Sequence, residues 1–216
     1  MVDLAQARRT MIDCQVRTFD VTDLGLLQVM DQTPREKFVP PAQLPLAYSD
    51  QLIHCGGRRW LLTPMAVARL LQALRIRAGE AVLDVGCGGG YTTALAAKLG
   101  GRVTGLESDP TLAALAKAGL AELGLGATVV TGPVAEGYPQ GGPFDAIIVN
   151  GAFQVAPDKL LEQLAPEGRL AGIDAGGSAP QAVLVRRAGK GFSRTALFDC
   201  AAPVFDGLRR APTFAF

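Results

Sequence analysis

The sequence is poor in the side chains that carry much enzyme chemistry. Its 216 residues include one histidine, one tryptophan and four cysteines. A catalytic triad or a histidine metal site would have to draw its imidazole from His54, whose only suggestive neighbour is Cys55. Successive side chains of an extended segment point in opposite directions, so these two residues cannot easily face one substrate. We therefore expect no metal site, and we expect His54 to lie in a loop.

Charge of one sign and long apolar runs are also scarce. With 21 basic and 20 acidic residues the formal net charge is +1, which gives no global field for binding nucleic acid. The pairs Arg58-Arg59 and Arg209-Arg210 are isolated and are expected to be solvated surface. No stretch reaches about 18 apolar residues, the amino terminus lacks the apolar core of a signal peptide, and the cysteines form no CxxC pair. These absences predict a cytoplasmic protein that binds neither nucleic acid nor membrane.

A glycine-rich turn lies near the middle of the chain. Residues 82–85, Val-Leu-Asp-Val, have the apolar character of a buried parallel strand, and residues 94–99 provide the packing face of a helix. The glycines at 86 and 88–90 separate these segments, so that backbone amides can come close to a ligand. A dinucleotide-binding turn would place a third glycine at position 91, where this chain has Tyr91. The spacing therefore disfavours a dinucleotide.

The spacing present is D-x-G-x-G-x-G, from Asp84 to Gly90. It resembles motif I of the class I methyltransferases that bind S-adenosylmethionine, in which the loop backbone approaches the amino-acid part of the cofactor. A second predicted strand, residues 103–107, ends at Glu107, where a carboxylate can accept hydrogen bonds from both ribose hydroxyls. The two features together predict S-adenosylmethionine as the cofactor. The residues predicted to bind it are Asp84, Gly86, Gly88, Gly90, Glu107, Ser108, Gly132, Pro133 and Asn150.

The order of the predicted elements indicates an α/β fold with a doubly wound, mostly parallel sheet in one compact domain. After the second strand, apolar segments typical of strands alternate with helical ones: strands at 127–131, 144–150 and 169–173, and helices at 110–124 and 158–165. Two final strands, at 182–186 and 195–198, can pair about a turn at 189–191. They would give the sheet an antiparallel edge hairpin.

The amino-terminal third is predicted to be a helical extension of this sheet. Amphipathic helices are expected in three places: at 3–18, at 24–30 with Asp20 or Thr22 as cap, and at 64–74 with Pro64 in the first turn. Residues 33–63 hold several prolines and the pair Gly56-Gly57 with little periodicity, and long irregular segments of this kind usually carry function. We therefore distinguish residues 1–78, with the helices and a substrate-side loop, from the cofactor-binding core at 79–216.

Several stretches outside the glycine turn resemble the protein-L-isoaspartate (D-aspartate) O-methyltransferase family over almost the full length. They are P-R-E-K-F-V-P at 34–40, A-Y-S-D at 47–50, Pro64 with Val67-Ala68, residues 84–91, P-F-D-A-I-I-V at 143–149, and Q-L at 163–164 followed by G-R-L at 168–170. The P-R-E-x-F-V-P run is the most telling, because a glycine turn would not predict it. The resemblance implies a seven-stranded Rossmann-like methyltransferase fold, S-adenosylmethionine as cofactor, and methyl transfer to isoaspartyl carboxylates of damaged proteins or peptides.

One departure from the family pattern affects the predicted acceptor site. The family usually carries T-I-S-Q-P before its third helix, with the serine at the reacting centre. This chain has Trp60-Leu61-Leu62-Thr63-Pro64, which puts Leu62 at the serine position and leaves Thr63 as the only candidate catalytic hydroxyl nearby. No general base is required, because a carboxylate with a pKa near 4 is already ionised at neutral pH. The substrate-side residues predicted to lie within reach of the transferred methyl group are Tyr48, Trp60, Leu62 and Thr63.

A second departure affects the predicted adenine site and leaves several functions open. The family tends to show G-D-G after its third strand, whereas this chain has Gly132-Pro133-Val134, so adenine would have to be held by backbone groups and apolar walls. Three functions are compatible with the sequence. They are carboxyl methylation of isoaspartyl residues, methylation of another acceptor, which the apolar Trp60-Leu61-Leu62 stretch favours, and binding of S-adenosylmethionine without catalysis.

Overall fold

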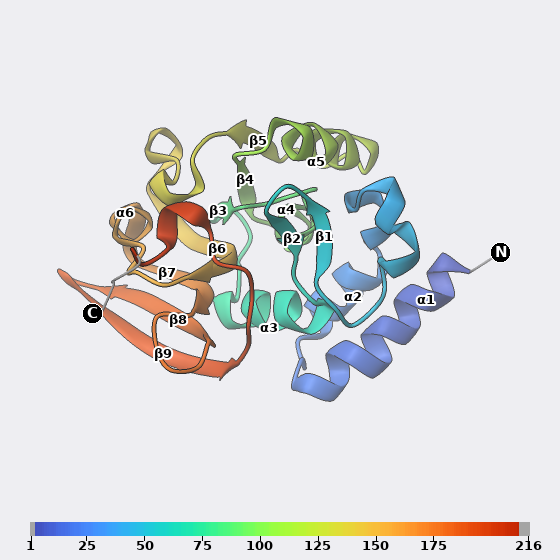
Figure 1. The fold of residues 1–216 in the computed structure, drawn as a ribbon, viewed down its shortest axis with the longest axis horizontal. Coiled ribbons are helices and arrows are strands. Elements are labelled where there is room, and N and C mark those ends of the chain that lie inside the picture. Colours follow the sequence, from blue (N-terminus) through green and yellow to red (C-terminus); the bar gives the residue numbers. More distant parts are fainter. Residues whose placement is uncertain (1–2, 212–216) are drawn as a thin grey trace, which may run out of the picture.

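Seven strands form one sheet in the computed structural model, which describes residues 3–211 (Figure 1). In chain order they are β3 (Ala81–Val85), β4 (Arg102–Glu107), β5 (Thr128–Thr131), β6 (Phe144–Phe153), β7 (Leu164–Asp174), β8 (Gln181–Ala188) and β9 (Gly191–Asp199). Their spatial order is β5-β4-β3-β6-β7-β8-β9. The strands from β5 to β7 are parallel, and β8 and β9 add an antiparallel hairpin at one edge. The predicted fold class is confirmed.

The sheet separates two hydrophobic clusters, because successive side chains of a strand point to opposite faces. In β6, Ile148 belongs to one cluster and Ile147 to the other. The larger cluster lies under α1 (Leu4–Met11), α2 (Leu24–Asp31), α3 (Pro64–Leu74), α4 (Tyr91–Lys98) and α5 (Pro110–Glu122). The opposite face is covered by the short α6 (Asp158–Glu162) and by Phe205 and Leu208. On this face, a segment near the carboxyl end of the chain covers part of the hydrophobic cluster, as helices do on the other face.

The helices begin mostly where their sequence signals lie. Thr63 caps α3 and Asp109 caps α5, and in both cases proline is the first helical residue. The cap of α2 is Asp23, whose carboxylate accepts a hydrogen bond within the first turn at 3.0 Å, so the prediction of Asp20 or Thr22 is wrong. None of the helices between residues 3 and 211 combines the length and the apolar character that a membrane crossing requires.

Several element boundaries differ from the prediction. The first helix is α-helical only to Met11 and continues as a π turn and a 3-10 turn to Phe19. The helix predicted at 158–165 ends at Glu162, because Leu164 already pairs with Phe144 as the first residue of β7. Short 3-10 turns complete the structure at Arg35–Phe38, Pro41–Leu46, Val134–Glu136, Pro139–Gly141 and Asp206–Leu208.

A small hairpin lies inside the segment that was predicted to be irregular. Its strands β1 (Ile53–Gly56) and β2 (Arg59–Leu61) pair antiparallel. The turn between them uses Gly56 and Gly57, whose φ angles of 119° and 52° are unfavourable for residues with a Cβ. His54 pairs with Trp60 across this hairpin, so the prediction of a loop histidine is wrong. Of the predicted substrate-side residues, Trp60 lies in this hairpin, and Leu62 and Thr63 connect the hairpin to α3.

Candidate functional site

The predicted cofactor turn joins β3 to α4. Gly86 and Gly90 have φ angles of 69° and 94°, which residues with a Cβ rarely adopt. The amides of Gly86 and Cys87 donate to the Leu106 carbonyl at 2.8 and 3.1 Å and so tie the turn to the end of β4. A Cβ on Gly90 would lie 2.9 Å from the Cβ of Ala116 in α5. The predicted strand, turn and helix are therefore present, and two helices can pack closely beside the turn.

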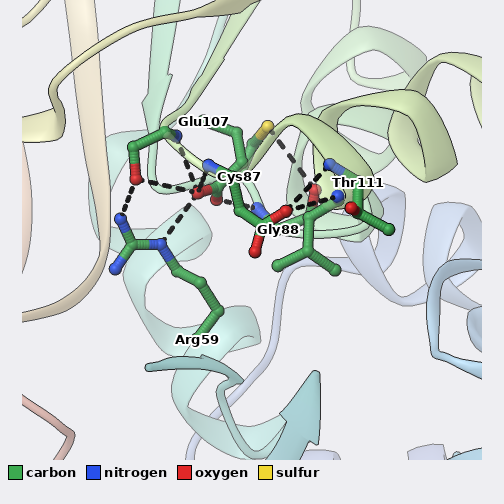
Figure 2. A network of polar contacts seen from close by, with 8 residues as sticks. Arg59, Cys87, Gly88, Glu107 and Thr111 are labelled. Carbon is green, nitrogen blue, oxygen red and sulfur yellow. Dashed lines mark hydrogen bonds and ion pairs between the residues drawn. The ribbon is translucent and has the colours of Figure 1, made fainter. Parts of the chain in front are cut away.

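Glu107, at the end of β4, is completely buried and accepts hydrogen bonds with both carboxylate oxygens (Figure 2). Oε1 accepts from Nε of Arg59 at 2.8 Å and from the amides of Ser108 and Asp109 at 2.7 and 3.0 Å. Oε2 accepts from the amide of Gly88 at 2.9 Å. A carboxylate oxygen has two lone pairs, so Oε2 retains capacity for a further donor such as a hydroxyl group. The glycine turn and the predicted ribose acid are thus one connected site.

Arg59 belongs to this site although the sequence did not predict it. Its side chain is only 12% exposed, pairs with Glu107 and also donates from Nη2 to the Ser108 hydroxyl. The prediction that Arg58-Arg59 is solvated surface is therefore wrong for Arg59, although Arg58 is exposed. The second arginine pair, at 209–210, is exposed as predicted. Strand β2 thus reaches over the glycine turn and provides a positive charge for the buried carboxylate.

Asp84 lies beneath the turn and holds two elements together. Its carboxylate accepts from the Thr93 hydroxyl in α4 at 2.5 Å and from the Asn150 amide in β6, and Asn150 accepts in turn from the Thr92 hydroxyl at 2.9 Å. Burial raises the pKa of Asp84 from 3.8 to about 7, although the Thr93 hydrogen bond opposes this rise. The nearby Glu107 carboxylate also raises it. Asp84 and Asn150 therefore position the turn, and their contact with a cofactor stays a prediction.

The raised pKa of Asp84 predicts a pH dependence that Asp84→Asn should remove. Because the folded state binds this proton more tightly than the unfolded state, the contribution of Asp84 to stability is present below about pH 4 and is lost as pH rises through 7. The wild-type free energy of unfolding should fall relative to that of Asp84→Asn by at most about 1.4 kcal/mol per pH unit in this range. Urea unfolding of both proteins at several pH values measures the difference. Parallel pH profiles would contradict the assignment.

Two further predicted cofactor residues lie beside Glu107. The amide of Gly132 donates to the main-chain carbonyl of Glu107 at 3.0 Å, and Pro133 follows at the start of a 3-10 turn. Ser108, which follows Glu107 in the chain, is exposed. The structure therefore brings Gly86, Gly88, Glu107, Ser108 and Gly132 to one end of β3, β4 and β5. Their contact with S-adenosylmethionine stays a prediction.

Tyr48, one of the predicted substrate-side residues, is engaged with the amino-terminal helices. Its hydroxyl donates to the Glu36 carboxylate and accepts from Nη1 of Arg8 in α1 at 3.2 Å. Burial, followed by the hydrogen bond to Glu36, raises the pKa of the phenol well above its ordinary value. The tyrosine hydroxyl therefore stays protonated near neutral pH and serves to link α1 to the segment before the hairpin. Its reach to the acceptor site stays a prediction.

The other predicted substrate-side residues have different environments. Trp60 is 37% exposed and its ring lies 4.7 Å from the His54 ring, centroid to centroid. Leu62 is only 1% exposed. Thr63 accepts a hydrogen bond from the Ala66 amide at 3.3 Å, as the cap of α3. A hydroxyl that accepts in this way still has its proton to donate, so Thr63 can serve both as a cap and as a donor to a ligand.

Arg35, from the P-R-E-x-F-V-P run, binds the backbone on both sides of the β1–β2 hairpin, at Ala47 and Leu62. It is completely buried, and it donates from Nε to the Ala47 carbonyl at 2.9 Å and from Nη2 to the Leu62 carbonyl at 2.6 Å. Its guanidinium also lies 4.8 Å from the ring centroid of Tyr91, the first residue of α4. The arginine therefore fixes the backbone at the family serine position relative to the glycine turn. The run was noted in the sequence, but its structural role was not predicted.

Phe205 reaches the glycine turn from the carboxyl end of the chain. It is 4% exposed, and its ring packs against Gly86, where a Cβ would overlap the ring atoms. A Cβ on Gly151, in β6, would lie 2.8 Å from two carbons of the same ring. The guanidinium of Arg59 lies 4.8 Å from the ring centroid. No pattern in the sequence indicated this contact.

Comparison with known proteins identifies relatives over most of the chain. A sequence profile of the protein-L-isoaspartate(D-aspartate) O-methyltransferase family matches residues 8–195. A protein-L-isoaspartate O-methyltransferase of Methylorubrum extorquens is 39% identical over 168 residues, which are 78% of this chain and 74% of the relative. One of Roseiflexus castenholzii is 39% identical over 190 residues, which are 87% of this chain and 86% of the relative.

Solved structures agree with this relationship at the level of the fold. A Plasmodium falciparum structure, described as a beta-aspartate methyltransferase in complex with S-adenosyl-L-homocysteine, superposes with a TM-score of 0.80 at 19% identity and covers 96% of this chain. A second, a protein-L-isoaspartate O-methyltransferase, gives a TM-score of 0.78 at 21% identity, and the match covers 91% of this chain and 65% of the other. With the profile match, the relatives at 39% identity and the shared fold, the chain belongs to the protein-L-isoaspartate(D-aspartate) O-methyltransferase family.

Proposed function

We propose that this protein transfers a methyl group from S-adenosylmethionine to the free carboxylate of isoaspartyl or D-aspartyl residues in proteins or peptides. Membership of the family over residues 8–195 is the observation that carries this proposal. The matched relatives are named for that reaction. The P-R-E-x-F-V-P run supports it further, because its Arg35 binds the carbonyl of Leu62, the residue at the position where the family places the serine of its reacting centre.

The residues around the glycine turn suit the cofactor of this family. Glu107 is buried with a free lone pair on Oε2, which fits a ribose hydroxyl better than a phosphate, because like charges repel. Gly86 carries no Cβ where the motif brings the backbone to the amino-acid part of the cofactor. Gly132 and Pro133 would border the adenine without an acidic partner. When bound, S-adenosylmethionine would supply a methyl group on a positively charged sulfur: a bond forms from the acceptor oxygen to the methyl carbon, and the carbon–sulfur bond breaks to leave the thioether S-adenosylhomocysteine.

The remaining task of the chain is to orient an acceptor carboxylate. This group is ionised at neutral pH, so that no side chain has to remove a proton. Proximity and orientation can account for most of the rate when the oxygen is held about 3 Å from the reacting carbon. Thr63 has a proton to donate to such a carboxylate, and the Leu62 backbone beside it is fixed by Arg35. Losing one oriented donor typically costs on the order of a hundredfold in rate.

A second candidate is methyl transfer to a different acceptor on the same scaffold. Leu62 occupies the family serine position and is buried, while Trp60 exposes an aromatic surface on the hairpin next to Arg59. Together they make the neighbourhood less polar than a carboxylate prefers. This candidate keeps the cofactor and changes only the substrate.

A methyl-transfer assay on a matched pair of peptides tests the proposal. One peptide contains a single isoaspartyl residue and the other contains aspartate at the same place, with labelled S-adenosylmethionine as the donor. We expect transfer to the isoaspartyl peptide only, at a rate about a hundredfold below that of a family member that carries the serine. Calorimetry with S-adenosylhomocysteine serves as the control for cofactor binding. Binding of the cofactor without transfer to either peptide would favour the second candidate.

A further inference from the structure

The ring of Phe205 lies against the backbone of Gly86, at the place where the motif predicts that the cofactor approaches the glycine turn. Two glycines face the ring, Gly86 in the turn and Gly151 in β6, and a Cβ on either would collide with it. A bare backbone at Gly86 is what the methyltransferase motif requires for close approach of the cofactor. The ring therefore takes up space against Gly86 that S-adenosylmethionine needs.

Main-chain hydrogen bonds dock the segment that carries this ring, residues 203–208, which we call the C-terminal strap. The Ala152 amide donates to the Pro203 carbonyl at 3.0 Å, and the Phe205 amide donates to the Ala152 carbonyl at 3.0 Å. The Gln154 amide donates to the Leu208 carbonyl at 2.8 Å. The strap thus lies along the end of β6, where an isolated parallel bridge joins Ala152 to Val204. It is short and contains no regular helix beyond the 3-10 turn Asp206–Leu208.

The strap also contacts the β1–β2 hairpin, through Arg58 and Arg59. Arg58 pairs with Asp206 at 3.1 Å, but both side chains are more than half exposed, so this ion pair contributes little. The contact of Arg59 is different, because its guanidinium lies over the Phe205 ring while Nε holds Glu107. Arg59 therefore touches both the strap and the acid predicted to bind the ribose. The hairpin and the strap close together over the glycine turn.

We propose that the C-terminal strap is a gate of the cofactor site, in which the docked Phe205 ring covers Gly86 and must leave before S-adenosylmethionine binds. This inference rests on the proposed function, because it takes S-adenosylmethionine as the ligand. Docking of the strap and binding of the cofactor are then mutually exclusive. The apparent affinity for the cofactor is reduced by the fraction of molecules whose strap is open. The strap thereby sets the cofactor concentration at which the enzyme becomes active.

Calorimetry with S-adenosylhomocysteine on Phe205→Ala tests the gate. Removing the ring favours the open state, so we expect affinity to rise at least about tenfold. Phe192→Ala is the matched control, because that phenylalanine is 46% exposed in the edge strand β9, where it lies opposite Arg187 of β8. Weaker binding by Phe205→Ala would show that the ring is a wall of the pocket, and equal binding would show that it does not compete. Either result overturns the gate.

Limited digestion with trypsin tests the gate in the unaltered protein, whatever the stability of the variants. Arg209 and Arg210 follow the strap directly, and Arg209 is held to Asp206 at 3.3 Å and to the Val204 carbonyl at 3.3 Å. Release of the strap frees both arginines, so S-adenosylhomocysteine should increase the rate of cleavage after them. Protection by the ligand would overturn the gate. Absence of S-adenosylhomocysteine binding in all proteins would instead reject the proposed function, and the gate with it.

Discussion

Glu107→Ala should weaken the binding of S-adenosylhomocysteine by about 10- to 150-fold, or 1.5–3 kcal/mol, the range for hydrogen bonds to a charged group. The carboxylate is buried and held from several sides, so its oxygens are aligned before a ligand arrives. Such preorganisation lowers the cost of ordering on binding. Calorimetry measures the change directly. The effect is expected to be the largest of any single substitution on cofactor affinity.

Two variants separate the role of the carboxylate from that of its surroundings. Glu136→Ala is the matched control, because Glu136 is an exposed glutamate that pairs only with Lys159 among the salt bridges of residues 3–211. Arg59→Met removes one donor of Glu107 and leaves its backbone donors in place, so it should cost less than Glu107→Ala. Unchanged affinity of Glu107→Ala would remove the ribose assignment. Preference of the wild type for NAD over S-adenosylhomocysteine would remove the cofactor assignment as a whole.

The core of this site could be predicted because its parts are local in the sequence. Asp84, the turn glycines and the strand ending at Glu107 follow from apolar runs and glycine spacing within a short stretch. Parallel strands then bring the ends of β3 and β4 to the same edge of the sheet, whatever the details of the rest of the chain. The order of strands and helices from β3 onward was predictable for the same reason.

The contacts that close the site could not be predicted from local patterns. Arg59 meets Glu107 across 48 residues, and the contact depends on the register of a hairpin whose strands are too short to show a period. In the sequence Arg59 is one of two adjacent arginines, with nothing to distinguish it from Arg58. Phe205 was equally hidden, because it reaches Gly86 only after the whole sheet has formed. Long-range contacts of this kind depend on tertiary structure rather than on local preference.

The acceptor side shows a second limit of sequence reasoning. The sequence indicates Thr63 as the hydroxyl near the missing serine, and the structure shows that Thr63 also caps α3. Its place in the segment predicted to be irregular indicates Tyr48 as a substrate-side residue, yet its hydroxyl is hydrogen-bonded to Arg8 and Glu36. In both cases the sequence identified a polar group but not its partners. For Arg35 the sequence shows the motif but no role, and only the fold shows that its guanidinium binds two main-chain carbonyls.

Leu62→Ser should raise methylation of an isoaspartyl peptide by on the order of a hundredfold, without changing the affinity for S-adenosylhomocysteine. The Leu62 carbonyl is fixed by Arg35 at 2.6 Å, so a serine here would start from a backbone position that is already held. Its hydroxyl could then orient the acceptor carboxylate beside Thr63. The exchange also removes a side chain that is 1% exposed, which should lower the free energy of unfolding by about 2–5 kcal/mol.

Leu61→Ser is the matched control, because it removes another buried leucine of the same hydrophobic cluster, one residue before the family serine position. It should lose stability in urea unfolding and gain no activity, whereas Leu62→Ser should lose stability and gain activity. Full family-like turnover in the wild type that Leu62→Ser leaves unchanged would show that the serine position does not matter in this chain. If wild type and Leu62→Ser both bind S-adenosylhomocysteine but methylate no isoaspartyl peptide, the carboxylate acceptor is wrong and the second candidate function replaces it.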